Sequence, residues 1–344
     1  MAGWPRSRQI AGLAALHLAA AVAGWGCRQI GVPLAWMIGP MLATAVLTGL
    51  PRFRAPPLPM RWCGQMIVAS AVALTLSPAA LWVIAADLHV MLGLSLASIF
   101  FAVLTARSMA RLELLDPTTS LLSLLPGGPA EMATLAERHG GRADFVALAQ
   151  TFRLSITVVS VPFLLLAIAP VVAPGTGAMD APPSVSALVA LALAAPLSFG
   201  LNRIGVANAF FVAPLVGVGV LSLSGLVQGP LPGWLVASGQ TLIGVSLGAM
   251  LRPRALMGMG HDLRLAMLFS VALVLLGLVM AAVLSLLGVS SLGEMVLAGS
   301  AGGVAEMAIA ASGFGFDPAY VSAYHLMRIF LIVPFAEHLL RLVR

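Results

Sequence analysis

Long apolar stretches, separated by short polar or Gly- and Pro-containing connections, make up almost the whole chain. Many of them approach the roughly 20 residues that an α-helix needs to cross a ~30 Å hydrocarbon core. The pattern therefore predicts an all-α membrane protein with 10–12 membrane segments. The twelve segments fall at residues 9–27, 32–50, 62–78, 81–106, 113–136, 144–173, 184–202, 206–227, 232–250, 264–288, 292–312 and 318–342.

A motif within this pattern recurs near the end of the chain. Gly127-Gly128-Pro129-Ala130-Glu131-Met132-Ala133 returns 175 residues later, from position 127 to position 302, as Gly302-Gly303-Val304-Ala305-Glu306-Met307-Ala308. The same shift relates Gly64 to Gly239, Gln150 to His325 and Arg153 to Arg328. Self-similarity at a fixed period indicates a duplicated unit. We therefore predict two membrane repeats, residues 1–175 and 176–344.

Composition strengthens the membrane interpretation. Hydrophobic residues make up 60% of the chain, charged residues 9%, and the mean hydropathy is +1.04. The net charge of +6 comes from arginines that lie mainly in short loops, so it does not predict a nucleic-acid partner. We expect the lipid bilayer of a bacterial inner membrane as the surroundings, and we leave open whether identical copies assemble.

The arginines also predict a topology. If both Gly-Gly-Glu segments enter and leave on one face, fifteen of the eighteen arginines lie inside, Arg28 lies outside, and Arg153 and Arg328 lie in spans. Twelve plain crossings would leave nine inside and seven outside. The positive-inside rule favours the re-entrant arrangement. Each repeat then has about five crossings plus one re-entrant or broken segment, so the repeats have inverted topology and both termini are cytoplasmic. Twelve plain helices in parallel repeats are the alternative.

Each Gly-Gly-x-x-Glu motif predicts the start of a helix at membrane depth. Gly127 and Gly128, like Gly302 and Gly303, supply a flexible break, and a glutamate follows in the first helical turn. Such a start presents unpaired N–H groups, which can hold a small solute. The simpler alternative is that Glu131 and Glu306 only complement their helix dipoles.

The helix after each motif carries a second polar pair. Gln150 and Arg153 are three residues apart, as are His325 and Arg328, so each pair shares one helical face. We expect Glu131 near Arg153 and Glu306 near Arg328. These sets are interpreted either as structural ion pairs or as gated pairs in which protonation frees an arginine for an anionic substrate. Among these groups His325 is predicted to be the most pH-sensitive, and Asp87 with His89 forms a further candidate pair.

Several chemistries lack their usual sequence signals. The six histidines and two cysteines show no metal-ligand spacing, and no phosphate-binding loop or nucleophile motif appears. We therefore predict no metal, no cofactor and no enzymatic activity.

The residues of both motifs resemble a known family. Leu125 to Met132 with Ala149-Gln150-Thr151-Phe152-Arg153, and Ala301 to Met307 with His325-Leu326-Met327-Arg328, resemble the duplicated domain of the AbrB family of bacterial membrane proteins. Members carry the labels "regulator of gene expression" and "putative ammonia monooxygenase". The family's general shape resembles inverted-repeat secondary transporters, and Pro129 departs from its usual motif.

Three functions follow as hypotheses. The first is a proton-coupled secondary transporter or exporter of a small anionic or polar metabolite, with the glutamates as coupling groups and the arginines as anion anchors. The second is a membrane sensor that binds a ligand and alters gene expression. The third, which we favour least, is a membrane monooxygenase, because it would need clustered metal ligands.

Overall fold

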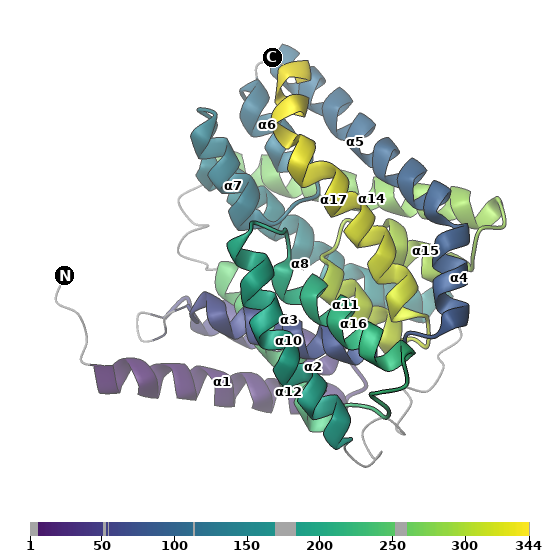
Figure 1. Cartoon of the computed structure of the whole chain (residues 1–344). Helices are drawn as coiled ribbons and strands as arrows, with labels where there is room; N and C mark the ends of the chain where they lie inside the picture. The colour runs from purple at the N-terminus through teal and green to yellow at the C-terminus, as the bar shows by residue number, and fades with distance from the viewer. Residues whose placement is uncertain are drawn as a thin grey trace. The chain divides into compact units, whose positions relative to one another are not determined.

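The computed structural model describes residues 6–50, 53, 55–112, 114–168, 184–251 and 260–343. Over these residues the chain forms fifteen α-helices and no strand, which confirms the predicted all-α class (Figure 1). The boundary predicted between the repeats at residue 175 lies outside the described residues. So do five of the arginines that support the predicted topology, namely Arg52, Arg54, Arg252, Arg254 and Arg344.

The described residues form two compact units, and each unit takes segments from both halves of the chain. Unit 1 contains the described parts of 1–77, 171–258 and 308–315. Unit 2 contains those of 78–170, 259–307 and 316–344. The predicted duplication at 1–175 and 176–344 stays a prediction, since compact units and sequence repeats are different divisions of one chain.

Unit 1 is a bundle of six helices and the end of a seventh. The six are α1 (Arg6–Gln29), α2 (Ala35–Leu47), α3 (Leu58–Ala73), α10 (Val185–Arg203), α11 (Ala209–Leu223) and α12 (Gly233–Met250). Helix α16 (Val304–Gly313) has its first four residues in unit 2 and the rest in unit 1. Within unit 1, α12 packs on α2 and α3, and α11 packs on α10 and α3.

Glycines allow the helices of unit 1 to approach closely. A Cβ atom at Gly64 would lie 2.7 Å from the carbonyl oxygen of Gly239, so α3 and α12 cross at two glycines that the 175-residue shift relates. Cβ atoms at Gly244 and Gly248 of α12 would lie still closer to the α2 carbonyl oxygens of Met37 and Met41. Small residues at helix crossings are typical of membrane helices, where close van der Waals packing replaces the hydrophobic effect.

Helices α2 and α11 begin alike. Leu34 and Asn208, which precede them, are the non-glycine residues with positive φ among those described, at 51° and 52°. Six residues later each helix contains a buried proline, Pro40 or Pro214.

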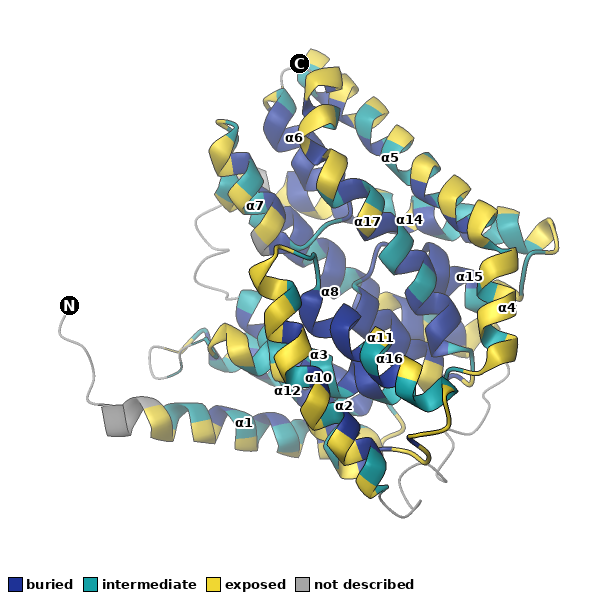
Figure 2. Cartoon of the chain, in the orientation of Figure 1, coloured by how far each residue is buried: buried dark blue, intermediate teal, exposed yellow. Residues whose placement is uncertain are grey.

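Unit 2 contains the two motif segments. Its helices are α4 (Pro78–Ala86), α5 (Leu88–Arg111), α6 (Pro117–Leu124), α7 (Pro129–Arg138), α8 (Ala143–Ile168), α14 (Gly260–Leu286), α15 (Leu292–Gly299), the start of α16, and α17 (Pro318–Val343). Helix α8 packs on α14, α7 and α6, and α17 packs on α5, α15 and α6. Helix α8 is largely buried (Figure 2).

Outward faces of unit 2 are apolar. On α5 the exposed side chains Leu92, Leu96, Phe100 and Leu104 recur every four residues, which makes one helical stripe (Figure 2). Helix α14 carries a comparable stripe that includes Leu268, Val271, Leu275 and Val279. Continuous exposed apolar stripes, combined with charged side chains in the interior, indicate a protein embedded in lipid.

Five described helices are long and apolar enough to cross a membrane: Ile10–Gln29, Leu88–Arg111, Ala143–Ile168, Val185–Arg203 and Arg264–Leu286. Helices α3 and α4 would together make a sixth span if they are counted as one. Helices α2, α11 and α16 are apolar but shorter. The ten crossings and the inverted arrangement therefore stay predictions, while the membrane-type helical fold is established.

Candidate functional site

Both predicted polar pairs lie in the interior of unit 2. Gln150 and Arg153 occupy one face of α8, and His325 and Arg328 occupy one face of α17. Arg153 is 2% exposed and Arg328 7%, while Gln150 and His325 are fully buried. Burying a guanidinium group is costly unless its N–H groups are satisfied, so the partners of these arginines are informative.

Each motif segment is a pair of short helices separated by an extended break. Helix α6 ends at Leu124 and α7 starts at Pro129, with Leu125 and Gly128 in extended conformations. Helix α15 ends at Gly299, Ser300 is extended, and α16 starts at Val304. The predicted helix starts after the glycine pairs are thus present. The end of a helix leaves its last carbonyl groups without intrahelical donors, and a buried break must find others.

The α8 pair supplies donors to the first break. Gln150 Nε2 donates to the carbonyl oxygens of Leu122 and Leu125, each at 2.7 Å. Arg153 Nη1 donates to Leu125 O at 3.3 Å, and Arg153 Nη2 donates to Gly127 O at 3.1 Å. These bonds satisfy carbonyl groups of the last turn of α6 and of the break.

The α17 pair makes the corresponding bonds to the second break. His325 Nε2 lies 3.0 Å from Leu297 O, and Arg328 donates through Nη1 to Ser300 O at 2.9 Å and through Nη2 to Gly302 O at 3.1 Å. Leu297, Ser300 and Gly302 each follow by 175 residues a carbonyl group that binds the α8 pair. The two halves of the chain therefore use the same positions for the same bonds.

Arg153 joins the two breaks. Its Nε donates to Ala301 O at 2.9 Å, so a single guanidinium group holds both interrupted segments. Arg328 differs at the corresponding atom, because its Nε is buried and has no hydrogen-bond partner. A small cavity of about 20 Å³ is lined by Arg328 and by Pro126 and Ala301 of the two breaks.

His325 bridges its arginine and the backbone. Besides the contact with Leu297 O, its Nδ1 lies 2.8 Å from Arg328 Nη2. Because a guanidinium group only donates and a carbonyl only accepts, we assign the neutral ring with its hydrogen on Nε2. A second proton on Nδ1 would break the bond to Arg328. The pH sensitivity of His325 stays a prediction, with this bond as the one that it would affect.

The two motif glutamates fold back over their own helix starts. A Cβ atom at Gly128 would lie 3.1 Å from Glu131 Oε2, and a Cβ atom at Gly303 would overlap the Glu306 carboxyl group. A glutamate in the third helical position that reaches back in this way complements the unpaired N–H groups of the first turn. Both glutamates interact with neighbouring groups. The expected pairing of each with its arginine stays a prediction.

The environments of the two glutamates differ. Glu131 is exposed, whereas Glu306 is 1% exposed. Helix α7 is polar beyond the motif, with exposed Glu137 and Arg138, while α16 continues in buried small and apolar residues. The first copy of the motif therefore begins a polar helix, and the second copy begins an apolar helix.

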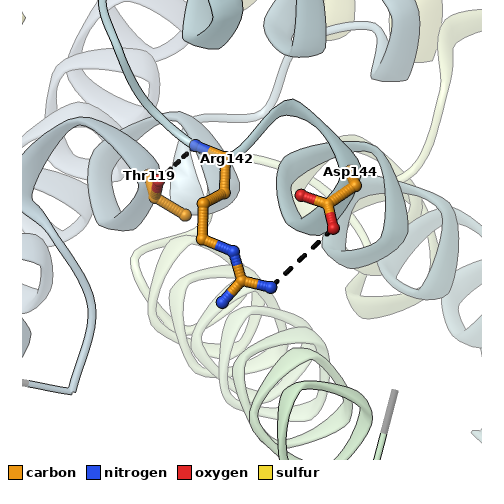
Figure 3. Close-up of polar contacts among 3 residues, drawn as sticks. All are labelled: Thr119, Arg142 and Asp144. Atoms are coloured by element: carbon orange, nitrogen blue, oxygen red, sulfur yellow. Dashed lines mark hydrogen bonds and ion pairs between the residues drawn. The ribbon is translucent and has the colours of Figure 1, made fainter. Parts of the chain in front are cut away.

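The connection between α7 and α8 is tied to α6. The backbone N–H of Arg142 donates to Thr119 Oγ1 at 2.7 Å, and the Arg142 guanidinium lies 3.8 Å from Asp144 Oδ2 (Figure 3). Thr119 is buried in the first turn of α6, and Asp116 caps that turn by accepting from the N–H of Thr119 at 2.8 Å. These bonds fix the start of α8, and hence the direction in which Gln150 and Arg153 project.

A second polar cluster contains Asp87, which the sequence analysis paired with His89, together with two tyrosines. Tyr320 of α17 donates its hydroxyl to Asp87 Oδ2 at 2.5 Å and lies 3.0 Å from the hydroxyl of Tyr324. Asp87 stands between α4 and α5, whereas the predicted partner His89 is exposed and lies 2.9 Å from Ala86 O. A sequence feature that could have predicted this cluster is the spacing of the only two tyrosines, which lie four residues apart on one apolar helix.

Among the described residues, no group of three or more His, Cys, Asp or Glu side chains is placed to hold a metal ion. The candidate site therefore consists of the two buried arginines, the backbone carbonyl groups that they bind, and the two motif glutamates.

These features define a helical membrane protein in which buried arginines hold two broken segments next to one another. Residues 36–344 match the sequence profile described as "Transition state regulatory protein AbrB", and the chain belongs to this AbrB family, as the resemblance of its motifs indicated.

Two relatives align over nearly their whole lengths. The Bacillus subtilis (strain 168) protein named "Uncharacterized protein YhjN" is 24% identical over 348 residues, which cover 94% of this chain and 91% of the relative. The Escherichia coli (strain K12) protein named "Putative regulator AbrB" is 23% identical over 311 residues, which cover 90% and 89%.

Proposed function

We propose that this protein is a secondary transporter of a small anionic or polar metabolite, coupled to protons. One observation carries the proposal: two interrupted helical segments lie together inside unit 2 and are joined by the Arg153 guanidinium group. Secondary transporters commonly build their substrate sites from such discontinuous helices, because the break provides polar backbone groups at membrane depth.

Glu306 is the proposed principal coupling group, with Glu131 as its counterpart. Glu306 is buried at the start of a helix beside the second break, and Arg328 binds the same break at Gly302. Protonation would remove the negative charge and weaken its interaction with the helix start. The backbone at the break could then rearrange around the substrate, which links proton binding to a conformational change.

The test is a flux measurement on protein reconstituted into liposomes. Currents on a solid-supported membrane are recorded after jumps in pH and after addition of pooled small organic acids and amines, for wild type, Glu131→Gln and Glu306→Gln. Glu137→Gln is the matched control, since Glu137 lies on α7 and is exposed. We expect a solute-evoked current that falls at least about tenfold in Glu306→Gln, falls less in Glu131→Gln, and persists in the control.

An electroneutral cycle would give no current, so uptake of radiolabelled solute and acidification of the lumen are measured in parallel. Absence of current, uptake and proton movement in wild type for every pool, with the protein folded, would contradict transport of these solutes.

The printed descriptions favour a second candidate. Both the family description and the name of the Escherichia coli relative refer to a regulator. A membrane sensor would bind its ligand at the same site and change conformation without moving it. Ligand-induced thermal stabilisation in the absence of any flux is the outcome expected for this alternative. Neither candidate requires enzymatic activity.

A further inference from the structure

The cavity beside Arg328 has the composition of a ligand pocket. It occupies about 20 Å³ within unit 2. Pro126 and Ala301 contribute backbone from the two breaks, and Leu273, Leu276 and Met280 of α14 contribute apolar side chains. Arg328 is the one charged residue among those that line it. The cavity therefore combines a single cationic donor with an apolar wall.

One N–H donor of Arg328, at Nε, has no acceptor among the described residues. Its Nε is buried without a hydrogen-bond partner, although the side chain is 7% exposed and both Nη atoms are bonded. The corresponding atom of Arg153 donates to Ala301 O at 2.9 Å. The residue that corresponds to Ala301 is Pro126, 175 positions earlier, and it lies on the wall of this cavity. Arg153 Nε thus has a carbonyl acceptor, whereas Arg328 Nε has none, and both Arg328 and Pro126 line the cavity.

An acceptor with a negative charge would suit the unpartnered Arg328 Nε best. A buried N–H of a charged group that lacks a partner costs free energy, and a charged acceptor recovers the most. Strongly hydrated anions such as sulfate would need several donors to replace their water, whereas a carboxylate that carries an apolar body needs few. The leucines and the methionine suit that body, and methionine side chains adapt readily to new shapes.

We propose that this cavity binds the carboxylate of a short-chain aliphatic monocarboxylate, with Arg328 Nε as its hydrogen-bond donor and Leu276 and Met280 against its hydrocarbon body. This inference deepens the proposed function, on which it rests, by naming the substrate class. A volume of about 20 Å³ holds about one water-sized group, such as a single carboxylate oxygen, so the rest of the acid requires the α14 side chains to change rotamer.

The experiment measures binding to the purified full chain in lipid nanodiscs by calorimetry. The probes are the sodium salts of the straight-chain acids from acetate to octanoate, with propionamide as the neutral counterpart of propionate and sulfate as the hydrated anion. We expect saturable binding of short acids, and affinity at least about tenfold lower for propionamide and sulfate. We also expect Arg328→Lys to weaken binding at least about tenfold, because lysine cannot reproduce the Nε donor while it holds the break.

A matched pair on α14 tests the site without disturbing Arg328. Leu276 lines the cavity, whereas the adjacent Leu275 is 55% exposed. Leu276→Ala should enlarge the cavity and move the preferred acid to a longer chain, while Leu275→Ala should leave the preference unchanged. This pair keeps the test decisive even if Arg328→Lys fails to fold.

Three results would overturn the inference. One is acids binding no better than propionamide, as expected if the cavity holds only an ordered water. Another is binding that is unaffected by both Arg328→Lys and Leu276→Ala, which would place the acids elsewhere. The third is affinity that rises steadily to octanoate without an effect of Leu276→Ala, as expected for fatty acids partitioning from the bilayer.

The proposed function and this inference can fail separately. Flux of amines or other solutes without binding of the acids would retain the transporter and reject the carboxylate. Binding that depends on Arg328 and Leu276, without any flux, would retain the carboxylate site and reject transport.

Discussion

At the scale of single residues, the site is organised by side chains that replace missing backbone donors. The carbonyl groups of Leu125 and Gly127 accept from Arg153, and those of Ser300 and Gly302 accept from Arg328. Each bond from a charged donor contributes about 1.5–3 kcal/mol. The arginines therefore stabilise the non-helical backbone of both breaks, which a buried segment would otherwise avoid.

His325 provides a direct test of this role. His325→Gln should lower stability by less than about 1 kcal/mol, because Gln150 already donates to the corresponding carbonyl group in the first half of the chain. His325→Leu should cost about 1–3 kcal/mol, because it removes the partner of Leu297 O and the acceptor of Arg328 Nη2. Thermal unfolding of the purified variants in detergent checks both values. Equal losses in the two variants would show that the hydrogen bonds of His325 do not matter.

At the scale of helices, close crossings and interrupted segments place the site. Gly277 of α14 approaches the carbonyl of Gly299 at the end of α15, where a Cβ atom would lie 2.6 Å from it. This approach brings the apolar face of α14 against the second break and so forms the wall of the cavity. Unit 1 relies on the same device between α2 and α12.

Gly244 tests the crossing in unit 1. In Gly244→Ala the new Cβ atom would overlap the backbone of Met37, which cannot move cheaply, so we expect a loss of about 1–3 kcal/mol or more. Gly200→Ala on α10 is the control, because nothing lies within 4 Å of its Cβ position. The control should be neutral or gain up to about 1 kcal/mol from the higher helix propensity of alanine. Unfolding in a denaturing detergent series compares them. Equal stability of the two variants would argue against the tight crossing.

At the scale of the whole molecule, both halves of the sequence contribute to each compact unit. Unit 2 holds both broken segments, both arginines and both motif glutamates, so the duplicated residues are gathered rather than kept in separate halves. Such gathering is what a transporter built from repeats would require. The orientation of the halves in the membrane is a separate matter, which the charge distribution predicts.

Cysteine labelling tests that orientation. With Cys27 and Cys63 first replaced by serine, a membrane-impermeant maleimide is applied to intact cells that carry Arg138→Cys or Gln228→Cys, two exposed positions. The inverted arrangement predicts labelling at 228 and protection at 138 until the cells are opened. Twelve plain crossings predict the reverse. Labelling of both positions from the same side would contradict both arrangements.

Much of the fold and part of the site could be predicted from the chain itself. Apolar segment length determines the helical membrane class, since backbone polar groups in lipid must bond internally. The Gly-Gly-x-x-Glu pattern predicts helix starts at Pro129 and Val304, because local backbone preferences act over a few residues. The spacing of three residues places Arg153 beside Gln150, and Arg328 beside His325, for the same local reason.

Tertiary structure alone decided which groups these side chains meet. The sequence predicts glutamates as partners of the arginines, which stays a prediction, and it does not predict that both arginines donate to carbonyl groups of the two breaks. It also decided that Glu306 is buried while Glu131 is exposed, and that Arg328 Nε has no hydrogen-bond partner where Arg153 Nε donates to Ala301. Local sequence specifies a helix and its faces, but contacts between different helices and breaks, which here join residues 26 to 148 positions apart, depend on how the helices pack.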